Sequence, residues 1–196
     1  YIECGRSQFR GCMDDFQAIT RLKRGDISGL AALVDRYQAR AVQTAYLITQ
    51  DTKAAEDVVQ GTFVQIYHSI QGVDPRRPFA PYLFRSVINA AVKAARRGKR
   101  DYSLDVETFD GLDTFADRLP DPSPLLDDEA ERAELRQSVR EAMDQLTPEQ
   151  RAAVVLRYFL DFSEAEMAQV LAIPAGTIKW RLHSAKKRLR ILLGER

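Results

Sequence analysis

Residues 163–182 read SEAEMAQVLAIPAGTIKWRL, and this stretch decides the fold of the C-terminal part of the chain. Ser163 followed three residues later by Glu166 is a capping box, which marks a helix start because both side chains satisfy backbone N–H groups of the first turn. The expected elements are a short helix over 164–171, a tight turn at 172–174 and a long basic helix over 175–192. A short helix, a tight turn and a basic helix form a helix-turn-helix.

Helical signals continue upstream of this motif. Thr147 followed by Gln150 is a second capping box, which predicts a helix over 148–160. Ser123 followed by proline predicts another helix that runs to about residue 146. Apolar residues at helical spacing predict three earlier helices, over 27–50, 51–69 and 81–99. No strand-like alternation persists, so the sequence predicts an all-α protein.

The predicted helices divide into two domains, over residues 13–100 and 123–196. Residues 101–122 contain Asp, Gly and Pro without a sustained period, which indicates an acidic flexible linker between them. Residues 1–12 precede the first methionine, Met13. We expect them to be an upstream extension or added sequence that takes no part in the fold.

The composition excludes several classes of protein. Hydrophobic residues make up 45% and charged residues 29% of the 196 residues, which is typical of a folded soluble protein. No window approaches the roughly 18 apolar residues of a membrane span, and no signal-type stretch opens the chain, so a cytoplasmic location is expected. Both cysteines precede Met13, and the only histidines are His68 and His183. A disulfide framework, a metal site and a bound cofactor are therefore not expected.

Charge is unevenly distributed, although the net charge is only +1. Residues 75–100 carry eight Lys/Arg and no acid, and residues 174–196 carry seven Lys/Arg and one Glu. Between them, residues 101–134 carry twelve acids and two Arg. Solvated surfaces can produce such a pattern. Two basic blocks can equally bind a polyanion, of which nucleic acid is the commonest.

Three motifs, in this order along the chain, resemble those of the extracytoplasmic-function (ECF) sigma factors of bacterial RNA polymerase. They are AEDVVQGTF at 55–63, PYLFRSVIN at 81–89, and LTPEQR at 146–151 with GTIKWRL at 176–182. The resemblance implies that 13–100 is sigma region 2, which binds core polymerase and the −10 element. It implies that 123–196 is sigma region 4, whose helix-turn-helix reads the −35 element.

The resemblance also implies roles for individual residues. The expected contacts with the β′ and β subunits of core polymerase are Glu56, Asp57, Gln60 and Phe63. The expected −10 contacts are Phe79, Tyr82, Arg85, Asn89, Lys93, Arg96 and Arg97. The expected −35 contacts are Thr177, Lys179, Trp180, Arg181, His183, Ser184 and Lys187. A sigma factor has no catalytic site of its own, and the family implies an anti-sigma factor, often membrane-anchored, that holds the protein inactive.

The segment 79–100 combines aromatic and basic side chains. Holding unstacked bases requires a basic groove with aromatic platforms, each stacked base contributing roughly 1–3 kcal/mol. Phe79, Tyr82 and Phe84 are candidates, although Tyr82 and Phe84 could instead pack in the core. Asn89 offers an amide donor and acceptor to a base edge, and the basic residues after it are expected to contact phosphates.

The basic helix over 175–190 is expected to enter the major groove with its N-terminal half. Lys179 and Arg181 can donate hydrogen bonds to guanine O6 and N7. Trp180 can contact a thymine methyl group, lie on a sugar or pack inside its own domain. His183 fits a phosphate or surface contact better than a metal ligand, because no second ligand lies near it in the sequence.

Several positions differ from the family pattern, so the promoter sequence cannot be carried over from a relative. Gly61 replaces a usual acidic residue, and glycine inside a helix costs about 1 kcal/mol relative to alanine. Ala172 replaces a frequent glycine of the turn, and Tyr82 a common tryptophan. Trp180 stands where a small residue is frequent, and His183 and Ser184 also depart from the usual residues.

Two other classes of function remain open at this stage. A stand-alone helix-turn-helix repressor or activator would explain the C-terminal domain, but it leaves the first domain without a role. An enzyme acting on nucleic acid would need a carboxylate or metal cluster, and the carboxylates are dispersed over helical surfaces. The acidic linker is either a solubilising tether or, as the family implies, a segment that passes through the polymerase near the RNA exit path.

Overall fold

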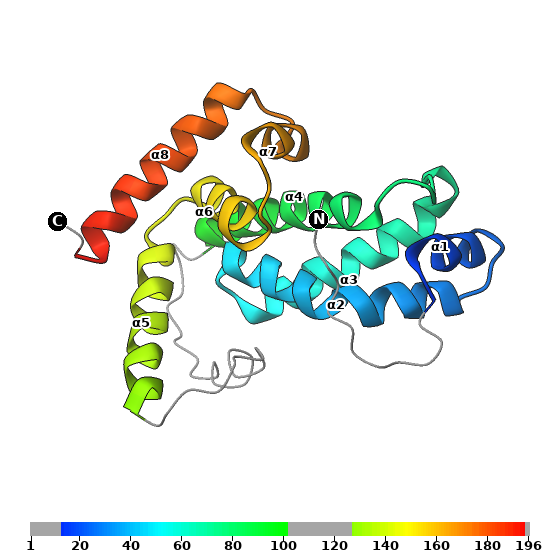
Figure 1. Ribbon diagram of the computed structural model, residues 1–196, viewed down its shortest axis with the longest axis horizontal. Coiled ribbons are helices and arrows are strands. Elements are labelled where there is room, and N and C mark those ends of the chain that lie inside the picture. Colours follow the sequence, from blue (N-terminus) through cyan, green and yellow to red (C-terminus); the bar gives the residue numbers. More distant parts are fainter. Residues whose placement is uncertain (1–12, 102–126, 195–196) are drawn as a thin grey trace. The chain divides into compact units, whose positions relative to one another are not determined.

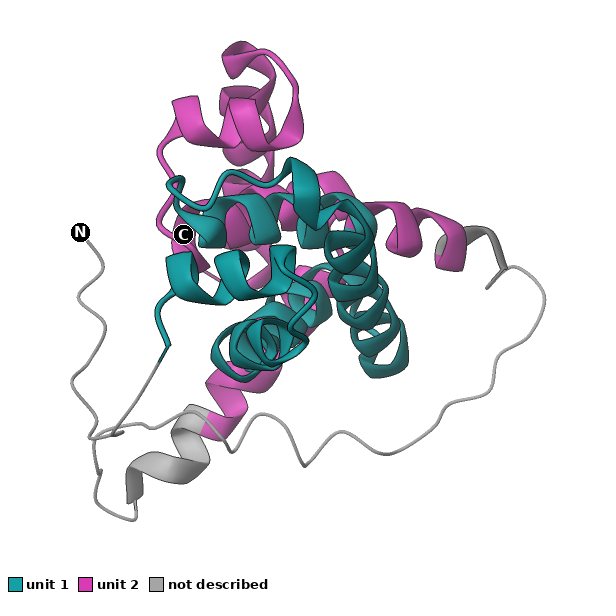
Figure 2. Ribbon diagram, turned by 90° about the vertical axis from the view of Figure 1, so that its right-hand side faces the viewer, with its two compact units in different colours: residues 1–91 teal, residues 92–196 magenta. Residues whose placement is uncertain are grey.

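The computed structural model describes residues 13–101 and 127–194, and every element in those ranges is a helix (Figure 1). This confirms the predicted all-α fold. The chain forms two compact units, residues 1–91 and residues 92–196 (Figure 2). The predicted extension at 1–12, residues 102–122 of the linker predicted over 101–122, and the predicted cap at Ser123 lie outside the described residues.

Unit 1 contains three helices, one 3-10 turn and the first half of a fourth helix. These elements are α1 (Asp15–Lys23), α2 (Ser28–Thr49), α3 (Thr52–Ser69), η1 (Ile70–Gly72) and α4 (Phe79–Asp101). Helix α2 packs against both α1 and α3, which confirms the predicted helices over 27–50 and 51–69. The core is filled by aliphatic side chains with Phe79 among them, such as Ile19, Leu33, Ile48, Ile66, Leu83 and Ile88.

Helix α1 was not predicted from the sequence. It has nine residues, of which only Ala18, Ile19 and Leu22 are buried, and so short an element shows little periodicity. Asp15 of this helix forms an ion pair with Arg36 of α2 and accepts a hydrogen bond from the Tyr37 hydroxyl at 2.6 Å. Burial, together with this bond to Asp15, raises the pKa of Tyr37 well above its ordinary value. These contacts fasten α1 to α2.

The crossing of α1 and α2 depends on Gly29. A Cβ atom at this position would lie 2.2 Å from the carbonyl oxygen of Ala18 and 3.0 Å from the backbone nitrogen of Leu22. Backbone atoms cannot swing aside as a flexible side chain can. The two helices can therefore approach this closely only where the residue has no side chain.

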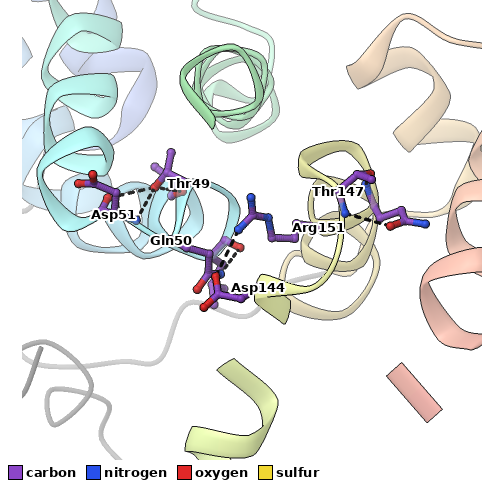
Figure 3. Close-up of polar contacts among 9 residues, drawn as sticks. Thr49, Gln50, Asp51, Asp144, Thr147 and Arg151 are labelled. Carbon is purple, nitrogen blue, oxygen red and sulfur yellow. Dashed lines mark hydrogen bonds and ion pairs between the residues drawn. The ribbon is translucent and has the colours of Figure 1, made fainter. Parts of the chain in front are cut away.

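A tight turn joins α2 to α3. Gln50 adopts a left-handed conformation with φ 59°, which ends α2. The Thr49 hydroxyl donates to the carbonyl oxygen of Asp51 at 3.0 Å (Figure 3), and the Asp51 side chain accepts from the backbone N–H of Ala54 at 2.8 Å. The cap fixes the start of the helix on which the predicted polymerase contacts lie.

Over residues 127–194, unit 2 contains five helical elements. They are α5 (Asp127–Asp144), α6 (Pro148–Val154), a π-helical turn η3 (Val155–Phe159), α7 (Glu164–Leu171) and α8 (Ala175–Leu192). Helix α8 packs against α5, α6 and α7. The core between these elements is formed by side chains of every helix, including Leu146, Leu156, Met167 and Ile178.

The helix predicted over 148–160 changes type at Val155. Its last turn is π-helical, and the N–H of Leu160 bonds to the carbonyl oxygen of Val155 at 3.0 Å. Val155, Leu156 and Leu160 are all buried. Asp161 then adopts φ 57°, and the chain turns toward the cap of α7.

Both predicted capping boxes are present. At α6, the Gln150 side chain accepts from the N–H of Thr147 at 3.0 Å, and the Thr147 hydroxyl accepts from the N–H of Gln150 at 3.3 Å. The next residue, Arg151, is buried and pairs with Asp144 at 3.7 Å (Figure 3). The cap and the ion pair together fix the corner between α5 and α6.

Candidate functional site

The turn of the helix-turn-helix is formed without glycine. Ala172 caps α7 in the left-handed conformation with φ 53°, and its N–H bonds to the carbonyl oxygen of Ala168. Pro174 then precedes the first residue of α8, and its carbonyl oxygen accepts from the N–H of Thr177 at 2.9 Å. The sequence predicted this turn at the correct residues, and the structure places α8 immediately after it.

Helix α8 has a core side and a solvent side. Ile178, Leu182 and Ala185 are buried. The opposite side of the helix carries exposed residues, which include Lys179, Trp180, His183 and Lys187. These four predicted −35 contacts therefore share one accessible surface, which we call the α8 face.

The other predicted −35 contacts lie at the borders of this surface. Thr177, Arg181 and Ser184 are half-buried. The Ser184 hydroxyl accepts a hydrogen bond from the buried Gln150 side chain at 2.9 Å, so Ser184 helps to hold α8 on α6. No local motif predicts this contact, because 34 residues separate the two side chains.

Charges around the α8 face are almost all positive. No acidic residue occurs over 175–192. The nearest acid that pairs with the helix is Glu164 of α7, whose carboxylate lies 4.0 Å from the Lys179 ammonium group, and both side chains are largely exposed. An exposed pair of this kind contributes little and can exchange for a phosphate contact.

The start of α7 is fixed by the second capping box. Glu166 accepts hydrogen bonds from the Ser163 hydroxyl at 2.6 Å and from the Ser163 N–H at 2.8 Å. These bonds lower the pKa of Glu166 below its ordinary value, because they favour the charged carboxylate. The negative charge also lies at a helix N-terminus, where the helix dipole favours it.

Helix α4 presents the predicted −10 contacts along one side. Leu83, Val87, Ile88 and Ala91 are buried on the core side. The exposed residues recur at intervals of three or four positions and comprise Tyr82, Arg85, Asn89, Lys93 and Arg96, with Arg97 beside them. From Tyr82 to Arg96 this row spans about 21 Å along the helix axis. We call it the α4 row.

Phe79 is not a stacking platform, which corrects the prediction made for this residue. Its side chain is 1% exposed and packs in the core of unit 1. The ring contacts Tyr37 with a centroid distance of 5.6 Å and Tyr82 with a centroid distance of 6.1 Å. Phe79, the first residue of α4, is therefore an aromatic residue of the core rather than of the DNA-binding surface. Phe84 is also buried, as the alternative for that residue proposed.

Tyr82 remains accessible at the N-terminal end of the α4 row. It is 38% exposed, and one side of its ring rests on Phe79. The Tyr82 hydroxyl lies 3.5 Å from the Ser69 hydroxyl at the end of α3. Tyr82 therefore contacts Phe79, and part of its surface remains accessible to a ligand.

Helix α3 carries the predicted polymerase contacts. Glu56, Asp57 and Gln60 are exposed, as expected for a binding surface. Phe63 is only 6% exposed and packs in the core, which contradicts its predicted role as a surface anchor. Its helical spacing with Val59 and Ile66 already matched the buried side of α3.

Two groups of residues were missed by sequence reasoning. Val64 on α3 is 50% exposed, and the signal was available, because it is an apolar residue outside the buried stripe of its helix. Arg76 and Arg77 are exposed in the loop before α4, where Asp74 accepts from the Arg76 N–H at 2.9 Å and pairs with Arg77 at 3.6 Å. These arginines extend the basic surface beyond the α4 row.

Metal-ligating clusters and membrane-spanning helices are both absent from the described residues. No group of three or more His, Cys, Asp or Glu side chains in the ranges 13–101 and 127–194 could hold a metal ion. None of the helices described is both long enough and apolar enough to cross a bilayer.

Two family models match the chain. The Sigma-70 region 2 family matches residues 33–101, and the Sigma-70, region 4 family matches residues 136–189. The ECF RNA polymerase sigma factor SigW of Bacillus subtilis is 31% identical, over 88% of this chain and 92% of the relative. The ECF RNA polymerase sigma factor SigL of Mycobacterium tuberculosis is 30% identical, over 85% of this chain and 89% of the relative.

Solved structures share the fold. The structure of CnrH in complex with the cytosolic domain of CnrY matches with a TM-score of 0.60 and 25% identity, over 92% of this chain and 97% of that chain. The sigma factor RpoE of Bartonella quintana, solved with the anti-sigma factor NepR, matches with a TM-score of 0.59 and 20% identity, over 89% and 98%. From the region 2 and region 4 matches and the identity to SigW and SigL, the chain belongs to the ECF sigma factors of RNA polymerase.

Proposed function

We propose that this ECF sigma factor directs core RNA polymerase to promoters, with residues 13–100 acting as region 2 and residues 123–196 as region 4. One observation supports this division above all others. The exposed sides of α4 and α8 are both basic, and no acid occurs over 79–100 or over 175–192. A chain with two basic helix surfaces is suited to bind two separate stretches of one polyanion.

The α4 row is proposed to hold the unpaired strand of the −10 element. Tyr82 offers an accessible ring on which a base can stack, and it stands next to Arg85 on the same side of the helix. Asn89 lies one turn after Arg85 and offers an amide to a base edge. Lys93, Arg96 and Arg97 are proposed to contact phosphates further along the strand.

The α8 face is proposed to read the −35 element as duplex. The N-terminal part of a recognition helix reaches base edges, and later turns approach the backbone. Lys179 and Arg181 can donate hydrogen bonds to guanine, and Lys187, two turns later, can contact a phosphate of the DNA backbone. Ser184 acts mainly by positioning the helix through its bond with Gln150.

The exposed side of α3 is proposed to contact the β′ subunit of core polymerase. Glu56, Asp57 and Gln60 supply charged and polar groups, and the neighbouring Val64 supplies apolar area. A polar surface with an apolar element is typical of protein interfaces. Phe63 contributes by packing α3 onto the core rather than by direct contact.

An anti-sigma factor is proposed as the regulatory partner. In one similar structure CnrH is in complex with the cytosolic domain of CnrY, and in another the sigma factor RpoE is in complex with the anti-sigma factor NepR. A membrane-anchored regulator would hold this chain at the cytoplasmic side of the membrane. The chain itself is proposed to have no catalytic site, to need no cofactor, and to supply specificity to the polymerase.

Run-off transcription tests the proposal. Core polymerase is incubated with a pool of genomic fragments, with and without the full chain, and transcripts are sequenced. We expect a small set of new start sites that share a −35 and a −10 element at fixed spacing. A stand-alone repressor or activator would instead bind DNA but neither co-purify with core polymerase nor create start sites, and that result would reject the proposal.

A further inference from the structure

Trp180 stands at the centre of the exposed side of α8. Its side chain is 66% exposed, although tryptophan usually buries most of its surface. The buried residues of α8, Ile178, Leu182 and Ala185, lie on the opposite side of the helix. Trp180 therefore points away from the core of unit 2.

The charge around Trp180 fits a polyanion. Lys179 and Arg181 flank it in the sequence, and Lys187 lies two turns further on the same side of the helix. No acidic residue occurs anywhere over 175–192. Within residues 179–187, Trp180 is the large apolar side chain that is exposed. A large apolar group in a basic surface is expected to face an apolar feature of the nucleic acid itself.

The chemistry of the indole ring narrows the choice of that feature. Tryptophan has one hydrogen-bond donor and no acceptor, so it cannot form the paired bonds by which side chains identify guanine or adenine. The C5-methyl group of thymine is the apolar group that base edges present in the major groove. Trp180 is the sixth residue of α8, within the part of a recognition helix that reaches base edges.

We propose that Trp180 reads a thymine of the −35 element through van der Waals contact with its C5-methyl group. This inference rests on the proposed function and assigns a base to one residue of the α8 face. It makes an A·T pair the preferred partner of Trp180. Lys179 and Arg181, which donate hydrogen bonds, remain the candidates for guanine.

Replacement of thymine by deoxyuridine tests the contact, because it removes the methyl group and leaves the base-pairing edge unchanged. A promoter selected by the wild-type holoenzyme from a −35 library is synthesised with each −35 thymine replaced in turn. At one thymine, we expect the affinity of the wild-type holoenzyme to fall about fourfold, as for the loss of one buried methyl group. For the Trp180→Ala holoenzyme, the thymine and uracil promoters should bind equally at that position.

A matched control separates this contact from general effects of losing an aromatic ring. Tyr158 in η3 is 54% exposed and belongs to the same unit, but it lies outside α8. Tyr158→Ala should keep the fourfold preference for thymine over uracil. Thermal unfolding of Trp180→Ala should match the wild type, since an exposed ring contributes little to packing.

Photo-crosslinking gives a second readout that a structural role would not produce. 5-Bromouracil carries bromine where thymine carries its methyl group, so it should be bound like thymine. Irradiation of the holoenzyme on a promoter with 5-bromouracil at the sensitive position should crosslink a peptide that contains residue 180. The Trp180→Ala holoenzyme should give no such product.

The outcomes distinguish the inference from the proposed function. If the wild-type holoenzyme binds the selected promoter but discriminates thymine from uracil at no −35 position, Trp180 does not read a methyl group. The same conclusion follows if Trp180→Ala retains the preference, or if it loses affinity equally on both promoters, as contact with a sugar or a protein partner would require. If no −35 library member is selected at all, the result contradicts the proposed function itself, and not only the role of Trp180.

Discussion

The Gln150 side chain donates a hydrogen bond to the Ser184 hydroxyl at 2.9 Å, which joins the first turn of α6 to the middle of the recognition helix. The carbonyl oxygen of the same amide accepts from the N–H of Thr147 at 3.0 Å. One buried glutamine therefore caps one helix and positions another. The orientation of the α8 face depends on this amide and on the packing of Ile178 and Leu182.

Removal of the Ser184 hydroxyl should lower stability without altering base preference. In Ser184→Ala the Gln150 amide loses its acceptor in a largely buried place, which should cost about 1–2 kcal/mol in the free energy of unfolding. Hydrogen exchange should show the lost protection in α6 and α8. Ser138→Ala, an exposed serine of α5, should change stability by less than about 0.5 kcal/mol. A changed −35 preference with unchanged stability would contradict this role.

Two helix glycines should respond oppositely to alanine. Gly29→Ala places a Cβ atom 2.2 Å from the carbonyl oxygen of Ala18, so α1 and α2 must separate, at a cost of about 1–3 kcal/mol. Gly61 has no atom within 4 Å of the corresponding position, and Gly61→Ala should stabilise α3 by about 1 kcal/mol. Denaturant unfolding measures both changes. Equal effects of the two variants would show that the α1–α2 crossing does not depend on Gly29.

The left-handed Ala172 should be improved by glycine. Its φ of 53° is costly for any residue with a side chain, so Ala172→Gly should raise the free energy of unfolding of unit 2 by about 1 kcal/mol. Ala165→Gly, an exposed position inside α7, should instead lower it by up to about 1 kcal/mol. Hydrogen exchange of α7 and α8 follows both variants. Destabilisation by Ala172→Gly would mean that the Ala172 methyl group makes a favourable contact.

The cap of α7 should make unit 2 sensitive to acid. The pKa of Glu166 is lowered by its bonds to Ser163, so the stabilisation is present above the unfolded value near 4.3 and is lost as the pH falls through the lower, folded value. Glu166→Gln keeps a capping oxygen but cannot titrate. Protection of the α7 amides should therefore depend less on pH in Glu166→Gln than in the wild type. Glu134→Gln in α5 controls for net charge, and an identical pH dependence in all three proteins would contradict the prediction.

Local signals in the sequence predicted most helices because they act within a few residues. The pairs Thr147–Gln150 and Ser163–Glu166 mark helix starts that the structure reproduces, and the turn at Ala172 follows directly from them. What the sequence missed depends on contacts between distant segments. Helix α1 is held by Asp15 through Arg36 and Tyr37, more than twenty residues away. No short sequence motif predicts such a contact.

The sequence predicted which helices carry the candidate site, but it did not predict for every side chain whether it is buried or exposed. An aromatic residue at helical spacing can face either side, and the choice between core and surface needs the position of neighbouring helices. Phe79 and Phe63 are both buried, whereas Tyr82 and Trp180 are exposed. The π-helical turn at Val155 also escaped prediction, because one extra residue in a turn leaves the apolar pattern of the sequence almost unchanged.

The α4 row is proposed to open the promoter and to hold the separated strand. The most direct test of this proposal is open-complex formation by the Tyr82→Ala holoenzyme, followed by permanganate reactivity of the −10 thymines, on duplex promoters and on promoters with a premelted −10 region. We predict that Tyr82→Ala, which removes the accessible ring at the head of the row, strongly reduces reactivity and run-off transcript on duplex DNA. On the premelted template most of the transcript should return, and binding to core polymerase should be unchanged. Wild-type levels of opening on the duplex by Tyr82→Ala, or equal losses on both templates, would contradict the account.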